Sequence, residues 1–226
     1  MEMDLLLNRS ELLMQNIGEL IAHPLYDQSI RLDISAQACF LSLEHAAAVR
    51  LLASNGMMIS APVMLRCQFE ALTRGIWSLY CAADEQLELL SIVLSEQSVE
   101  AGRSMPSASV MLQALKAVPN AAEPMRCLSE FKEHSWKALN SYVHSGLHAF
   151  RRQAEGYPAE LAIGMVRQSN GLMMLAGMQI ALLTGVPGGQ KLFLPLNERF
   201  GDCFLFIGPR DASESFRNTR RDTAPS

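Results

Sequence analysis

The stretch that decides the fold is residues 60–82, SAPVMLRCQFEALTRGIWSLYCA. Ser60 and Pro62 are typical of a helix start, because proline fits the first turn, where its missing N–H is harmless. An apolar row at helical spacing follows, and it comprises Leu65, Phe69, Leu72, Ile76 and Leu79. The rest of the surface is mostly small or uncharged, and a helix that is apolar nearly all round lies at the centre of its bundle. We therefore predict a central helix here.

This helix carries three charged residues, Arg66, Glu70 and Arg74, at positions i, i+4 and i+8. The spacing places them on one face of the helix. In one interpretation the trio is a solvated ladder in which Glu70 pairs with both arginines, at a few tenths of a kcal/mol per pair. In the other, the charges are partly buried, need partners and support a site. The scarcity of other charges on this helix favours the second.

Helical periodicity continues on both sides of this segment. The predicted helices cover residues 3–22, 29–54, 60–82, 84–99, 107–118, 124–153 with a break near Gly146, and 159–184. The apolar runs at 192–194 and 204–207 are short enough for strands or extended packing segments. The predicted fold is an all-α, up-and-down bundle of six or seven helices with a short irregular C-terminal extension. We expect one domain over residues 1–208 and a disordered polar tail over residues 209–226.

Composition limits the class of partner. The chain has 226 residues, of which 49% are hydrophobic, so it can bury a sizeable core. Its net charge of −4 means that its overall field does not attract nucleic acid or anionic membrane, and contact with a polyanion needs a local basic patch. The five cysteines are widely spaced and form no CxxC pair, so neither a zinc knuckle nor a disulfide framework is predicted.

Residues 168–190 carry no charge, which raises the question of a membrane span. A span needs about 20 predominantly apolar residues. Polar side chains interrupt this run, among them Gln168, Ser169, Asn170 and Gln179. We therefore predict a buried bundle helix. The N-terminus also lacks the basic region of a signal peptide, and we expect a cytoplasmic protein without membrane contact.

A second polar row follows helical spacing further along the chain. It comprises Lys137, Asn140, His144, His148 and Arg151, and an apolar row beside it comprises Trp136, Leu139, Val143, Leu147 and Phe150. One continuous helix would bury the apolar row and present the polar row as a single strip. An imidazole there can move a proton at neutral pH, and neighbouring cations can stabilise an oxyanion or bind an anion without any chemistry. The alternative is a solvated amphipathic face.

A metal-dependent hydrolase is a further alternative. His144 and His148 would share one ion, with Glu70 or His45 completing its ligands. No HExxH pattern occurs, and cations crowd the same face, which disfavours a bound metal. The GxGxxG, P-loop and GxSxG patterns are also absent. We therefore expect neither a metal nor a cofactor.

Two segments resemble those of known families. Residues 61–72, APVMLRCQFEAL, resemble the "LLR…(L/F)EAL" helix of several uncharacterised bacterial all-helical families, and residues 139–146, LNSYVHSG, resemble their "LNxYVHxG" segment. This resemblance spans about residues 35–185 and implies fold rather than activity. More distantly, the pair resembles the HEPN superfamily of helical bundles, which combines an "RxxLE" helix with a later "GNxxAH" motif. Asn140 and His144 have the same Asn-to-His spacing.

The HEPN resemblance implies a bacterial stress or defence protein, such as a member of a toxin–antitoxin system, that binds RNA or a nucleotide. Active HEPN proteins are metal-independent ribonucleases and typically dimeric, so a homo-oligomer is expected. Their signature is an arginine, four to six residues, then histidine; here Lys137 is the nearest cation before His144, with six residues between. The implied catalytic residues are His144, Asn140 and His148, and the implied substrate-binding residues are Lys137, Arg151, Arg66, Glu70 and Arg74. The alternative is a non-catalytic module for an anionic ligand or a protein partner.

Overall fold

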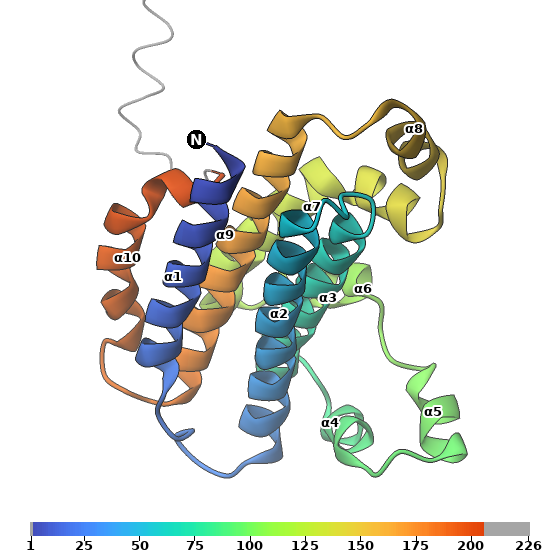
Figure 1. Ribbon diagram of the computed structural model, residues 1–226. Coiled ribbons are helices and arrows are strands. Elements are labelled where there is room, and N and C mark those ends of the chain that lie inside the picture. The colour runs from blue at the N-terminus through green and yellow to red at the C-terminus, as the bar shows by residue number, and fades with distance from the viewer. Residues whose placement is uncertain (1, 206–226) are drawn as a thin grey trace, which may run out of the picture.

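The computed structural model describes residues 2–205, which form ten α-helices and three short 3-10 helices without any strand (Figure 1). The α-helices are α1 (Met3–Ile21), α2 (Ile30–Ser54), α3 (Ala61–Tyr80), α4 (Asp84–Ser91), α5 (Glu96–Gly102), α6 (Ala108–Leu115), α7 (Ala122–Val143), α8 (Leu147–Glu155), α9 (Ala159–Leu183) and α10 (Leu194–Arg199). The predicted all-α fold is confirmed. The helices outnumber the prediction because two predicted helices are each divided and the C-terminal extension is itself helical.

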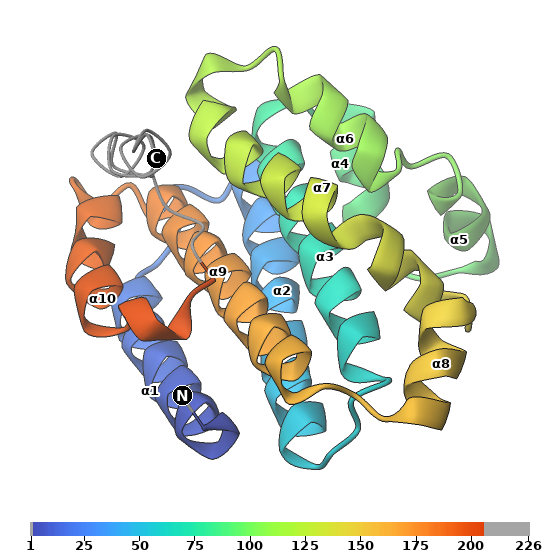
Figure 2. The same ribbon diagram turned by 90° about the horizontal axis from the view of Figure 1, so that it is seen from above.

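Helix α3 lies at the centre of the bundle and packs against α2, α6, α7 and α9 (Figure 2). Its closest approach is to α2 at Gly75. A Cβ atom added there would lie 2.7 Å from the Cys39 sulfur and 3.0 Å from the Ser35 carbonyl oxygen. The Ser35 hydroxyl also donates a hydrogen bond of 2.7 Å to the Gly75 carbonyl. The backbones of α2 and α3 therefore approach each other closely at Gly75, because glycine has no side chain to separate them.

Helix α9 contains the uncharged run that raised the membrane question. Several of its polar residues bond to neighbouring helices: Ser169 of α9 and Gln68 of α3 exchange hydrogen bonds of 2.7 and 2.9 Å. Asn170 donates a 2.7 Å bond to the Ser10 hydroxyl of α1. These bonds satisfy polar groups inside the bundle, which confirms the prediction of a buried helix. Within the described residues no helix combines the length and the apolar character needed to cross a membrane.

The single helix predicted over residues 84–99 is wrong, because the segment divides into α4 and α5. The chain is extended at Ile92 and restarts as a helix at Ser95. The Ser98 N–H donates to the Ser95 hydroxyl at 3.1 Å, and the Ser95 N–H donates to the Ser98 hydroxyl at 2.8 Å. This reciprocal cap satisfies two free amides and favours a new helix start.

The expectation that residues 192–194 form a strand or an extended packing segment is also wrong. Residues Gly189–Phe193 form a 3-10 helix that leads directly into α10. Pro195 lies in the first turn of α10, a position that favours a helix. The second run, 204–207, begins with extended backbone at Phe204, and the predictions for its last residues and for the tail at 209–226 lie outside the described residues.

Gly75→Ala tests the close approach of α2 and α3. The added methyl group must displace the Cys39 sulfur or the Ser35 backbone, so we expect a loss of about 1–3 kcal/mol in the free energy of unfolding. Gly18→Ala is the matched control, since an added Cβ at this helical position meets nothing within 4 Å and should stabilise α1 by about 0.5–1 kcal/mol. Urea denaturation followed by circular dichroism measures both. A Gly75→Ala protein as stable as wild type would contradict the close approach.

Candidate functional site

The helix predicted over residues 124–153 bends where α7 meets α8. Ser145 adopts the left-handed conformation, with a φ angle of +49°, and Gly146 follows in extended backbone. The Ser141 hydroxyl then accepts a 3.0 Å hydrogen bond from the His148 N–H and so satisfies one of the free amides of α8. The predicted break near Gly146 is confirmed.

The bend divides the predicted polar strip. Lys137 and Asn140 lie on α7, His144 ends α7, and His148 and Arg151 lie on α8. The apolar row is divided as well: Leu139 is buried, but Leu147 and Phe150 are 74% and 68% exposed. The expectation that one helix buries the whole apolar row is therefore wrong, because α8 turns away from the core and buries only Ala149.

Arg66 of α3 is held by three contacts, one to Glu70 within its own helix and two that join it to α7. Its Nε atom donates to a Glu70 carboxylate oxygen at 2.7 Å, and its Nη1 atom donates to the Asn140 Oδ1 atom at 2.9 Å. The guanidinium carbon lies 3.5 Å from the centre of the Trp136 ring, which in turn packs edge-on against Phe69. The Arg66 side chain is only 13% exposed. Arg66 is thus part of the packing between two helices, whereas Glu70, whose side chain is 41% exposed, contacts Arg66 from the same helix.

Arg74 does not share this arrangement. Glu70 bonds to Arg66, and Arg74 has no ion pair within the described part of the chain. Burial lowers the pKa of the half-buried Arg74 guanidinium, and the charge of Glu70 opposes that shift. Glu70 therefore pairs with Arg66 and not with Arg74, so the interpretation in which it pairs with both arginines does not describe the trio.

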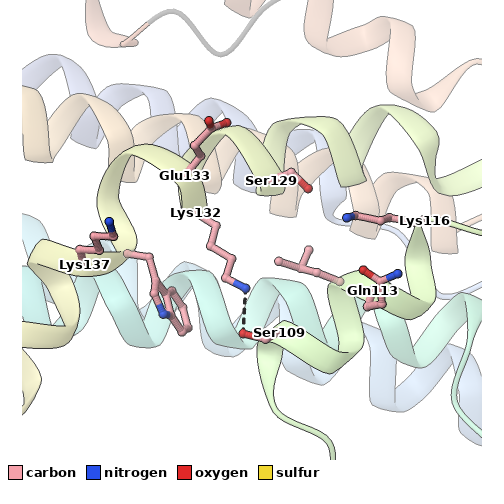
Figure 3. A pocket seen from close by; sticks show the side chains of 9 residues that line it. Ser109, Gln113, Lys116, Ser129, Lys132, Glu133 and Lys137 are labelled. Atoms are coloured by element: carbon pink, nitrogen blue, oxygen red, sulfur yellow. Dashed lines mark hydrogen bonds between the residues drawn. The ribbon is translucent and has the colours of Figure 1, made fainter.

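A pocket of about 360 Å³, which we call the lysine pocket, lies between α6 and α7 (Figure 3). Its lining residues are Ser109, Leu112, Gln113, Lys116, Ser129, Lys132, Glu133, Trp136 and Lys137. Lys132 reaches across from α7 and donates a 2.7 Å hydrogen bond to the Ser109 hydroxyl (Figure 3). Its ammonium nitrogen lies 5.2 Å from the centre of the Trp136 ring, within reach of a cation–π contact.

The lysine pocket concentrates positive charge in a protein of net charge −4. Three of the four lysines of the chain, Lys116, Lys132 and Lys137, line it. None of the three has a carboxylate partner within 4.0 Å among residues 2–205, although Glu133 lines the same pocket. Lys116 ends α6, where the helix dipole favours a cation. The sequence pattern identified only Lys137 as a binding residue. The signal for the other two is that three of the four lysines lie within residues 116–137.

The histidines of the predicted strip have different surroundings. His144 is exposed at the end of α7, whereas His148 lines a separate cavity on the other flank of α7. Arg151 is exposed and pairs with Glu155. Within residues 2–205, no three His, Cys, Asp or Glu side chains gather as a metal site would require, so the ligand set of the metal-dependent alternative is not assembled.

The architecture is that of an all-helical protein with a cationic pocket between α6 and α7. The chain belongs to a family of unknown function (DUF6988), whose model matches residues 39–206. The matched range includes α3, α6, α7, α8 and α9, and thus the Arg66 contacts and the whole lysine pocket. No curated protein and no solved structure matches the chain. The expected membership of an uncharacterised helical family is confirmed, and the HEPN relationship stays a prediction.

Arg66→Lys tests whether the guanidinium holds α7 against α3. Lysine keeps the charge but cannot bond to Glu70 and Asn140 while lying flat on Trp136, so we expect a loss of about 1–2 kcal/mol in the free energy of unfolding. Arg151→Lys is the control, because that exposed pair with Glu155 should contribute at most about 0.5 kcal/mol. Equal urea midpoints for the two variants would show that Arg66 contributes no more than a surface arginine.

Proposed function

We propose that this protein binds RNA or a nucleotide, with the phosphate groups held in the lysine pocket. The observation that supports this most is the gathering of Lys116, Lys132 and Lys137 around one hollow. Like charges around one pocket repel one another, and a phosphate group relieves that repulsion while accepting hydrogen bonds from ammonium groups. The local patch also supplies the attraction to a polyanion that the overall charge of the protein does not.

The other lining residues suit the rest of a nucleotide. Trp136 offers aromatic surface on which a base can stack, and stacking tolerates any base because each has a π face. Arg66 covers one face of the indole and Phe69 packs against it, so the ring is held in place before a ligand arrives. The hydroxyl groups of Ser109 and Ser129 and the amide of Gln113 add hydrogen-bonding groups around the phosphates.

Cleavage of bound RNA is a second candidate function, and the position of His144 favours it. His144 follows Lys137 by seven residues on the same side of α7, about 10 Å along the helix axis. Its exposure leaves it accessible to a polymer held by the lysines. Arg66 donates to the side-chain oxygen of Asn140, which lies between Lys137 and His144 in the sequence. The side-chain N–H groups of Asn140 therefore remain available to a ligand. His144 would accept the proton of a ribose 2′-hydroxyl, whose oxygen attacks the adjacent phosphorus to form a 2′,3′-cyclic phosphate, while the P–O5′ bond breaks and the leaving 5′-oxygen takes a proton from water. A HEPN-like defence role and a homodimer stay predictions.

Lys137→Gln tests binding. Loss of one phosphate contact should weaken the affinity for a labelled single-stranded RNA about tenfold and lower the slope of log affinity against log salt by about 0.7. Lys191→Gln is the matched control, since it removes the fourth lysine, which lies away from the pocket on the 3-10 helix before α10. Fluorescence anisotropy over a salt series measures both. An equal loss in the two variants, or no RNA binding by the wild type at low salt, would contradict the proposal.

His144→Ala separates cleavage from binding. Removing a general base should slow RNA cleavage by about a hundredfold or more while leaving RNA affinity near that of wild type. The assay uses mixed RNAs in the presence of a chelator, with His23→Ala, an exposed histidine between α1 and α2, as a control for contaminating nuclease. Wild-type cleavage no faster than that of His144→Ala rejects the ribonuclease reading and leaves the protein as a binding module.

A further inference from the structure

A second cavity, which we call the tyrosine cavity, lies on the flank of α7 opposite the lysine pocket. Its volume is about 440 Å³, which is within the usual range for small-molecule sites. It is bounded by the start of α3, one face of α7, α8, α9 and the turn that joins α8 to α9. The residues of α7 that line it, such as His134 and Ala138, differ from those that line the lysine pocket. Nothing in the proposed function uses this cavity.

The inner wall of the tyrosine cavity is apolar. Leu65, Leu139 and Met165 come from three different helices and are at most 5% exposed. Ala138 and Gly164 line the same space with little or no side chain. A Cβ atom added at Gly164 would meet only Leu205, at an ordinary contact distance of 3.6 Å. The small residues therefore leave space for a ligand beside apolar side chains, and such a surface favours a ligand whose buried part is apolar.

Aromatic rings form another side of the cavity. Tyr142 lies between His148 and Tyr157, with ring centres 6.3 Å apart in each pair and planes tilted by 37° and 42°. The three rings come from α7, α8 and the turn after Gly156, so the bend at the end of α7 brings them together. Tilted rings at this spacing are a favourable surface for a further aromatic ring.

Arg152 supplies the positive charge of the tyrosine cavity. It is half-buried and lacks an ion pair inside residues 2–205, whereas the neighbouring Arg151 is exposed and pairs with Glu155. A guanidinium beside an apolar wall is stabilised by an anion that it can bind through two hydrogen bonds, as a carboxylate allows. Glu160 also lines the cavity, and its negative charge disfavours a doubly charged phosphate monoester.

Tyr157 can complete the recognition of an anion. Burial, together with the neighbouring Tyr142, raises the pKa of the Tyr157 phenol. The hydroxyl therefore stays protonated at neutral pH and can donate a hydrogen bond to a ligand oxygen.

We propose that the tyrosine cavity binds a small aromatic carboxylic acid. Arg152 holds the carboxylate, Tyr142 and Tyr157 pack against the ring, and the apolar wall formed by Leu139 and Met165 receives its edge. The site is separate from the lysine pocket and does not depend on RNA binding.

Isothermal titration of the full chain with benzoate, naphthoate and indole carboxylate tests the proposal. At least one acid should bind saturably in the micromolar to low millimolar range, and its neutral amide should bind about tenfold more weakly or not at all. Arg152→Gln should weaken the acid about tenfold or more, while Arg151→Gln, the adjacent arginine outside the cavity, should leave its affinity unchanged. Gly164→Leu should also reduce binding, because its side chain fills the cavity.

Three results would overturn the proposal. They are no saturable binding by any of the acids, equal binding of acid and amide, and equal affinity in wild type and Arg152→Gln. Circular dichroism and melting of each variant establish that a loss of binding is not a loss of fold, and the two independent variants keep the test decisive if one of them unfolds.

Discussion

The contact on which both candidate sites depend is the Arg66 guanidinium lying flat on Trp136. This stacking and the bond to Asn140 fix α3 and α7 to each other, while the ion pair with Glu70 within α3 orients the same guanidinium. The energy of such a contact exceeds that of a surface ion pair because its charge is largely screened from water. With α7 fixed in this way, one flank faces α6 and forms the lysine pocket, and the other faces α9 and forms the tyrosine cavity.

The bend at Ser145 and Gly146 decides which residues reach which site. A straight helix would place His148 and Arg152 beyond His144 on the outside of the bundle. The Ser141 hydroxyl caps α8 instead, and His148 and Arg152 of α8 line the tyrosine cavity together with residues of α9. The same turn leaves Leu147 and Phe150 in contact with water. One local backbone conformation thus converts a single row of polar residues into parts of two separate sites.

Much of the fold could be predicted because its signals are local. The 3.6-residue periodicity of residues 60–82 identified the central helix, and the burial of Arg66 beside Glu70 follows from the scarcity of charge there. The site could be predicted only in part, because a pocket joins residues distant in sequence. Nothing local pairs Lys116 on α6 with Lys137 on α7, or Tyr142 with Tyr157 across a turn. The prediction of one polar strip also required a straight helix, and the left-handed conformation of Ser145 ends that helix.

Amide chemical-shift mapping of the full chain with a short RNA and with naphthoate tests most directly whether α7 separates two sites. RNA should shift the amides around Lys116, Lys132 and Lys137, and naphthoate should shift those around Tyr142 and Arg152. Each ligand should produce its own set of shifts in the presence of the other. Overlapping sets, or displacement of one ligand by the other, would contradict the assignment of two sites to the two flanks of α7.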